Sequence, residues 1–236
     1  MSRKKRLLCI LLALAVVIGG VCCWQRNNLR ALGMSMQLSQ DELSSKMDQQ
    51  QARTEEASRQ AGVNVRALTD EEKTALRDSE VSREELIDRI AGAEPSAEES
   101  GSSPEAVPAP PAAQQPQQDD SEAALRSQLA KYIAEIYVME AEYTDWLAQA
   151  NQSAIDEFTA LPESEQTTAN KYSIGMKYLS AALEKEKECD AKMASIEDSV
   201  RSVLKQLGED TSLADEIHSA YLEEKAAKKA YYLSIH

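Results

Sequence analysis

The first feature of the hydrophobic pattern is an unbroken apolar run over residues 7–24. Its sequence, LLCILLALAVVIGGVCCW, contains 18 residues and no charged side chain. As a helix rising about 1.5 Å per residue, this run would be roughly 27 Å long, enough to cross the hydrocarbon layer of a bilayer. The pattern therefore predicts a transmembrane signal anchor, with the lipid bilayer as the partner of residues 7–24.

Charges on the two sides of this run predict its orientation. Residues 1–6 form a basic tail with four Lys and Arg side chains, whereas only Arg26 and Arg30 follow the run closely. The more positive flank of a membrane span stays in the cytoplasm. We therefore expect a single-pass protein of the cell membrane with a cytoplasmic N-terminus and an extracytoplasmic remainder.

Two other interpretations of the same run remain open. A cleaved secretory signal would give a secreted protein, but cleavage after Gly20 would place Ile18 where a small residue is preferred. Lipidation at Cys22 or Cys23 is the other alternative, although Val21 is not the small residue expected before a lipidated cysteine. All three interpretations export the chain.

Polar residues dominate the next segment, 25–91, which has helix-start signals but little apolar surface. Ser39, Thr69 and Ser82 each precede a Glu by three residues, the spacing of a capping box. They predict short helices at about 40–60, 70–78 and 83–91, and Gly62 should end the first of them. Residues 25–120 contain no aromatic side chain, so we expect a weakly helical stalk without a globular core of its own.

The second and third of these short helices carry a few apolar residues that would close a small helix-turn-helix. These are Leu76, Val81, Leu86, Ile87 and Ile90. A docking module is the functional interpretation, and a marginally stable spacer is the alternative that the low apolar content favours.

Proline marks the segment 92–121, which contains six of the seven prolines among Ala, Ser, Glu and Gln. This composition predicts a disordered linker with extended polyproline II stretches, able to reach up to roughly 90 Å at about 3.1 Å per residue. A ligand for an aromatic groove is the alternative, but no Lys or Arg flanks the prolines to form a recognition motif.

From residue 122 onward, apolar residues recur every three or four positions. The first seam is Leu125, Leu129, Tyr132, Ile136, Met139, Tyr143, Trp146 and Ala150, and the second includes Leu179, Ala182, Cys189, Met193, Ile196, Val200, Val203 and Leu207. The spacing predicts helices at about 122–160, 166–207 and 212–234, separated by Pro162 and Gly208. Short loops make sequential helices antiparallel. The predicted fold class is all-α, ending in a coiled-coil-like antiparallel three-helix bundle over 122–236.

Composition changes this picture in two ways. The net charge is −14, but beyond residue 24 there are 22 Lys and Arg against 40 Asp and Glu, a balance of −18. A chain this acidic repels phosphate backbones, so nucleic acid is excluded as a partner. Of the eleven aromatic residues only Trp24 precedes residue 132, which predicts that the core lies near the C-terminus.

A search for chemistry assigns no catalytic, cofactor-binding or metal-ligating residue. The chain has no phosphate-binding glycine loop, dinucleotide fingerprint or nucleophile elbow, and its only histidines are His218 and His236. Asp215 and His218 have the carboxylate-x-x-His spacing of di-iron helical bundles, but that site needs a second pair and two more carboxylates. Only Glu186 interrupts the other apolar stripes, so we expect no cofactor.

Two further features have competing interpretations. Cys189 is the only cysteine beyond residue 23 and lies on an apolar stripe, which favours a small buried side chain over a reactive or bridging thiol. The C-terminal end is locally basic, with Lys225, Lys228 and Lys229 among tyrosines 221, 231 and 232. It is either a contact surface or, as we favour, core tyrosines with lysines that cover acidic neighbours.

These observations lead to an expected function without catalysis. A membrane-anchored extracytoplasmic helical protein of this kind should act as a protein-interaction or assembly module whose partner is an unknown envelope protein. The alternative is a self-associating structural spacer or scaffold of the cell envelope, in which the partner is a second copy of the chain. A helical metal-dependent enzyme is a minor alternative.

Overall fold

The computed structural model describes residues 30–31, 33–92 and 117–234, and in this part of the chain it is all-helical and contains no strand. The predicted membrane run 7–24 and all but the two ends of the linker 92–121 lie outside the described residues. Among the described helices, none combines the length and the apolar character needed to cross a membrane. The all-α fold class predicted from the sequence is thus confirmed for the described residues.

The chain forms two compact units. The larger unit is residues 55–214, and the smaller one combines the residues before Glu55 with those from Asp215 onward. In chain order the helices are α2 (Gln40–Gln60), α3 (Asp70–Arg77), α4 (Arg83–Ala91), α5 (Gln117–Thr159), the short η1 (Glu163–Glu165), α6 (Thr168–Leu207) and α7 (Ser212–Ser234).

Helices begin where the capping patterns predict. Thr69 Oγ1 accepts from the backbone N–H of Glu72 at 3.3 Å, and the Glu72 carboxylate accepts in return from the N–H of Thr69 at 3.0 Å. Ser39 forms the same reciprocal pair with Glu42, and the hydroxyl of Ser82 caps α4. These hydrogen bonds confirm the three predicted caps. Each cap satisfies backbone N–H donors that have no partner within the helix.

Three helices end with the same pair of backbone hydrogen bonds around a residue with positive φ. Gly62 (φ 70°) and Gly208 (φ 73°) occupy this position after α2 and α6, which confirms their predicted roles as terminators. After α3 the position is taken by Ser79 (φ 58°), whose side chain makes the left-handed conformation costlier than it is for glycine.

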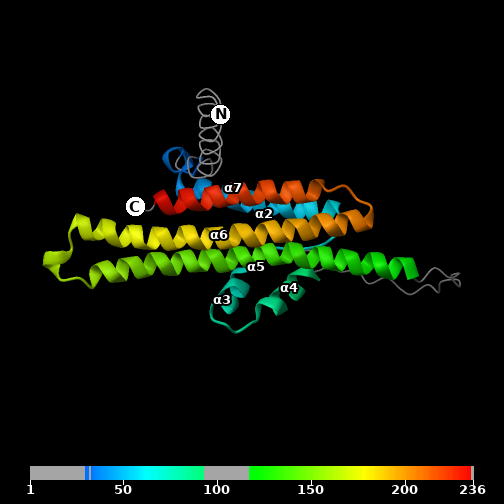
Figure 1. Ribbon diagram of the computed structural model, residues 1–236, viewed down its shortest axis with the longest axis horizontal. Helices are drawn as coiled ribbons and strands as arrows, with labels where there is room; N and C mark the ends of the chain where they lie inside the picture. Colours follow the sequence, from blue (N-terminus) through cyan, green and yellow to red (C-terminus); the bar gives the residue numbers. More distant parts are fainter. Residues whose placement is uncertain (1–29, 32, 93–116, 235–236) are drawn as a thin grey trace, which may run out of the picture. The chain divides into compact units, whose positions relative to one another are not determined.

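The larger unit is organised around α5 and α6, which pack side by side as a long antiparallel hairpin (Figure 1). Its buried residues lie in one half of the hairpin. On α5 they fall between Leu129 and Met139, and on α6 between Cys189 and Leu204. We call residues 129–139 and 189–204 the basal hairpin, and residues 140–188, which join them, the distal hairpin.

Helices α3 and α4 pack against α5, so the predicted stalk contributes to the core of the larger unit. Leu86 and Ile90 of α4 have no exposed surface, and Val63, Val65 and Leu68 of the preceding loop are also buried. This arrangement differs from the expected weakly structured segment. The difference arises because the apolar partner of these short helices lies on α5, beyond the proline-rich segment, where local periodicity cannot reveal it.

Ion pairs join the same helices. Arg83 of α4 donates to Glu135 on α5 at 3.0 Å. It also pairs with Glu142, about two turns further along α5. Asp88 pairs with Lys131 at 2.7 Å. Burial opposes the charge of Arg83, but the two carboxylates outweigh that cost and raise its pKa above the usual value.

In the smaller unit, α7 packs with the first part of α2. Leu43 of α2 is fully buried with Ala227 and Ala230 of α7, and Met34, Leu38, Met47 and Tyr231 surround this cluster. Arg30 and Glu223 add an ion pair of 3.1 Å. The sequence grouped the last helix with α5 and α6 alone. Ala227 and Ala230 pack against Leu43, although the mostly polar sequence of α2 gave little sign of this contact.

Candidate interaction site

Asp215 and His218 are the pair that the sequence singled out for its metal-ligand spacing. Asp215 and His218 are both exposed on α7. Across the described residues there is no group of three or more His, Cys, Asp and Glu side chains placed to hold a metal ion. The structure therefore brings no further ligand to the pair that the sequence singled out.

Cys189 is a free cysteine, 7% exposed, in the basal hairpin. Burial raises the pKa of its thiol, because a thiolate loses its hydration there, and the nearby charges of Lys185 and Lys192 only partly oppose this effect. The prediction of a small buried apolar side chain is confirmed.

The basic C-terminal stretch is not an exposed patch. Lys225 and Lys228 are each 8% exposed, and Lys228 pairs with Glu224 one turn earlier at 3.1 Å. Lys225 lies over the ring of Tyr221, 5.6 Å from its centroid, at a distance where a cation and an aromatic face attract each other. The side chain of Tyr232 is outside the described residues. These contacts favour the interpretation that the lysines and tyrosines serve packing.

The distal hairpin is the largest part of the larger unit without a core. None of the residues 140–188 is buried. Its two helices are joined by polar contacts, in which Glu157 accepts from Lys177 at 2.7 Å and from the Tyr178 hydroxyl at 3.0 Å. The Lys177 ammonium and then the Tyr178 hydroxyl hold the pKa of Glu157 below its usual value.

Exposed apolar side chains gather on this distal hairpin. The large hydrophobic residues with high exposure in the described chain are Met36, Ile155, Tyr172, Met176 and Leu179, and all but Met36 lie here. Tyr172, Met176 and Leu179 follow one another by four and three residues on α6, at exposed fractions of 70%, 42% and 48%. Residues at these spacings share one helix face. We call these three residues the α6 stripe.

A concave feature lies at the junction of the two halves of the hairpin. It is a groove of about 410 Å³ bounded by α3, α5 and α6. Its lining includes the buried residues Met139 and Cys189, and half-buried Leu76, Tyr143 and Trp146 add apolar surface. Four basic side chains line it as well: Lys73 and Arg77 of α3, and Lys185 and Lys192 of α6.

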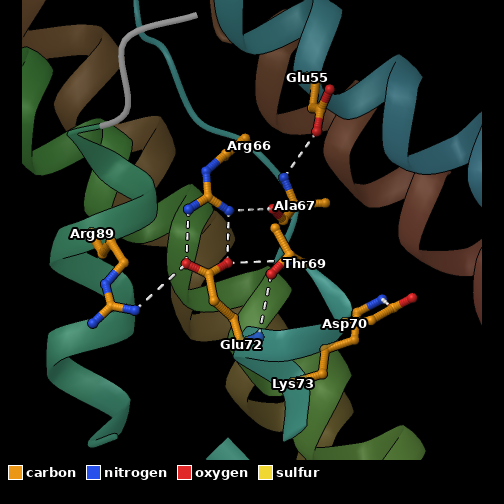
Figure 2. A network of polar contacts seen from close by, with 8 residues as sticks. All are labelled: Glu55, Arg66, Ala67, Thr69, Asp70, Glu72, Lys73 and Arg89. Atoms are coloured by element: carbon orange, nitrogen blue, oxygen red, sulfur yellow. Dashed lines mark hydrogen bonds and ion pairs between the residues drawn. The ribbon is translucent and has the colours of Figure 1, made fainter. Parts of the chain in front are cut away.

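The position of α3, which forms one wall of this groove, is fixed by a polar network around Glu72 (Figure 2). Arg66 donates two hydrogen bonds to the Glu72 carboxylate, at 2.7 and 2.8 Å, and a third to the carbonyl of Ala67 at 3.0 Å. Arg89 of α4 approaches the same carboxylate at 3.8 Å. The Arg66 hydrogen bonds lower the pKa of Glu72 more than its burial raises it. The network thus ties α3 to the preceding loop and to α4.

Sequence reasoning did not find the groove or the α6 stripe. Their residues were present as signals: Lys73, Leu76 and Arg77 share a face of α3, and Tyr172 and Met176 begin a seam that the second stripe already continued. No local pattern shows that α3 and α6, about a hundred residues apart, border one cavity.

The chain matches no protein family, no curated protein and no solved structure.

Proposed function

We propose that the protein is a non-catalytic interaction module that binds another protein through the α6 stripe of its distal hairpin. The observation that carries this proposal is the concentration of exposed large apolar side chains on a hairpin segment with no buried residue. An exposed apolar surface at helical spacing is typical of a face that meets another helix.

The setting of this module is part of the same proposal. Residues 7–24 anchor the chain in the cell membrane with the N-terminus in the cytoplasm, and the linker 92–121 and the helical bundle, in its three-helix form over 122–236, lie outside it. This setting is supported by the uncharged run of 18 residues and by the basic tail before it. A smaller membrane-bound form than the full translation product would contradict the retained anchor.

The test places a photo-crosslinking amino acid at Met176 or Leu179 of the full chain in intact membranes. We expect both positions to give the same crosslinked species, because they lie on one face of α6. Ala181 is the matched control, since it is also exposed but lies about 140° or more around the helix axis from each residue of the α6 stripe. Equal crosslinking at Ala181, or no specific product at Met176 and Leu179, would contradict the proposal.

A second candidate function is self-association as an envelope spacer or scaffold, and the spacing of the α6 stripe favours it. Steps of four and three are the period of a coiled-coil seam, which can pair with an identical seam of a second copy. Sedimentation of the full chain in detergent distinguishes the two candidates. A monomer at high micromolar concentration contradicts the scaffold, whereas a dimer that Met176→Glu dissociates supports it.

The minor alternative, a helical metal-dependent enzyme, has no supporting geometry among the described residues. Elemental analysis of the purified full chain tests it directly. Stoichiometric transition metal would revive it, and its absence would remove it.

A further inference from the structure

The groove between α3, α5 and α6 has the composition of a ligand site. Its volume of about 410 Å³ lies within the range of roughly 300–1,000 Å³ that is usual for small-molecule sites. Part of its lining is apolar or aromatic and includes Met139, Trp146 and Leu76. Such surface suits a flat or aliphatic body of a few rings or carbons.

The charges around this apolar surface differ from those of the chain as a whole. The chain carries −14, yet four cations and three carboxylates line the groove. Glu142, one of those carboxylates, already pairs with Arg83 from outside the lining, and Glu188 pairs with Lys185 at 3.0 Å. Within the lining itself cations exceed carboxylates by one, but Asp70 and Asp78 just outside it pair with Lys73 and Arg77. The attraction for an anion therefore depends on a cation without such a partner.

Lys192 is the cation that is open to a ligand. Lys73, Arg77 and Lys185 each pair with a carboxylate close to them in sequence: Asp70, Asp78 and Glu188. Lys192 forms neither an ion pair nor a hydrogen bond within the described chain, and it lies one turn of α6 from buried Cys189, which also lines the groove. An anion bound to it would not have to displace an internal partner.

We propose that this groove binds a small amphipathic anion, whose aromatic or short aliphatic body lies against Trp146 and whose acid group pairs with Lys192. Binding is favoured because the apolar body of the ligand and the apolar lining of the groove both lose contact with water. The acid group gains a charge-assisted contact with a cation that has no carboxylate partner among the described residues. This site is independent of the α6 stripe and of the proposed protein partner.

The experiment uses the full chain in detergent with Trp24→Phe, so that 5-fluorotryptophan labels Trp146 alone. Its ¹⁹F resonance is followed while 2-naphthoate or 2-naphthamide is added. The two compounds share a ring system, and only the first is an anion. Because each compound is compared across variants in one detergent condition, its partition into micelles affects all variants equally.

We expect 2-naphthoate to give a saturable shift of the Trp146 resonance, and Lys192→Glu to weaken its apparent affinity about tenfold or more. The same variant should leave 2-naphthamide nearly unchanged. Lys187→Glu is the matched control, because it makes the same charge change at an exposed position of α6 outside the groove. High salt should weaken the binding of 2-naphthoate alone.

Three results would overturn the proposal. The first is the absence of a saturable shift with either compound. The second is an equal loss of 2-naphthoate affinity in Lys192→Glu and Lys187→Glu, which would indicate only the general field of the surface. The third is an equal loss for both compounds in Lys192→Glu, which would show that the site does not recognise charge. Unchanged circular dichroism in both variants excludes loss of the fold as the cause.

Discussion

The basal and the distal halves of the hairpin belong to the same two helices, yet they differ in how they are stabilised. In the basal hairpin Leu129, Ile133 and Val200 have no exposed surface, and α4 contributes Leu86 and Ile90 to the same core. In the distal hairpin no residue is buried, and Glu157 joins the two helices through polar contacts. In this hairpin the regular apolar period forms a core where α4 also packs against α5.

This contrast also separates the residues that stabilise the fold from those of the proposed interaction surface. Most hydrophobic stabilisation comes from apolar area removed from water, which the basal half has and the distal half lacks. A segment that contributes little to the core can expose an apolar face without destabilising the fold further. The location of the α6 stripe in the distal half is therefore consistent with its proposed role as a protein-binding surface.

The largest expected difference is between two leucine truncations. Leu86→Ala removes a fully buried side chain of α4 and should lower the free energy of unfolding by about 2–5 kcal/mol, because it loses apolar burial and leaves a cavity. Leu179→Ala is the matched change at a side chain 48% exposed, and should cost no more than about 0.5 kcal/mol. Urea denaturation measures both. Similar losses would mean that the distal half is as well packed as the basal half.

The next difference concerns the network that fixes α3 (Figure 2). Glu72→Gln keeps the size of the side chain but removes the charge that accepts both hydrogen bonds from Arg66, and should cost about 1.5–3 kcal/mol. Glu157→Gln makes the same change in the exposed distal pair and should have the smaller effect, because solvent screens that pair.

The pH dependence gives the sign of the same effect. Because the pKa of Glu72 is lower in the folded state, its stabilisation is complete above the unfolded value of about 4.3 and is lost as the pH falls through the folded value. Denaturation at neutral pH and at pH values below about 4 should therefore show a smaller acid-induced loss in Glu72→Gln than in the parent. An unchanged acid-induced loss would contradict the role of the network.

Gly62 and Gly208 have the same backbone conformation but different surroundings, so the same substitution should have different costs at the two positions. Gly208→Ala places a side chain at φ 73° in open space, and should cost about 1–2 kcal/mol from the left-handed conformation alone. At Gly62 the new Cβ would also lie 2.6 Å from Nη1 of Arg126, which donates to the carbonyl of Ala61. Gly62→Ala should therefore cost about 1 kcal/mol more than Gly208→Ala.

A double-mutant cycle isolates that additional cost. In an Arg126→Ala background the clash at Gly62 is absent, so Gly62→Ala should cost about as much as Gly208→Ala. Thermal unfolding followed by circular dichroism measures all four combinations. Strict additivity of Gly62→Ala and Arg126→Ala would contradict the contact.

Local chemistry explains which parts of this structure could be predicted. The caps at Thr69 and Ser82 and the terminators Gly62 and Gly208 depend on residues within one turn, so the sequence shows them directly. Leu86 and Ile90 depend on a partner on α5, and Arg83 pairs with Glu142 across 59 positions. The groove needs Lys192 and α3 together, and only tertiary packing brings them to one cavity. The features that could be predicted depend on residues close in the sequence, and the others depend on residues far apart in it.

The smallest expected effect tests whether the two halves of the hairpin unfold separately. Gly175 lies inside α6 in the distal half, and a Cβ there would meet no atom within 4 Å. Gly175→Ala should therefore stabilise the helix by about 0.5–1 kcal/mol, because alanine loses less backbone entropy than glycine. If the distal half opens without the basal half, amide hydrogen exchange should slow around residue 175 while the global free energy of unfolding stays unchanged. An equal rise in global stability would show that the two halves unfold as one cooperative unit, in spite of the difference in burial.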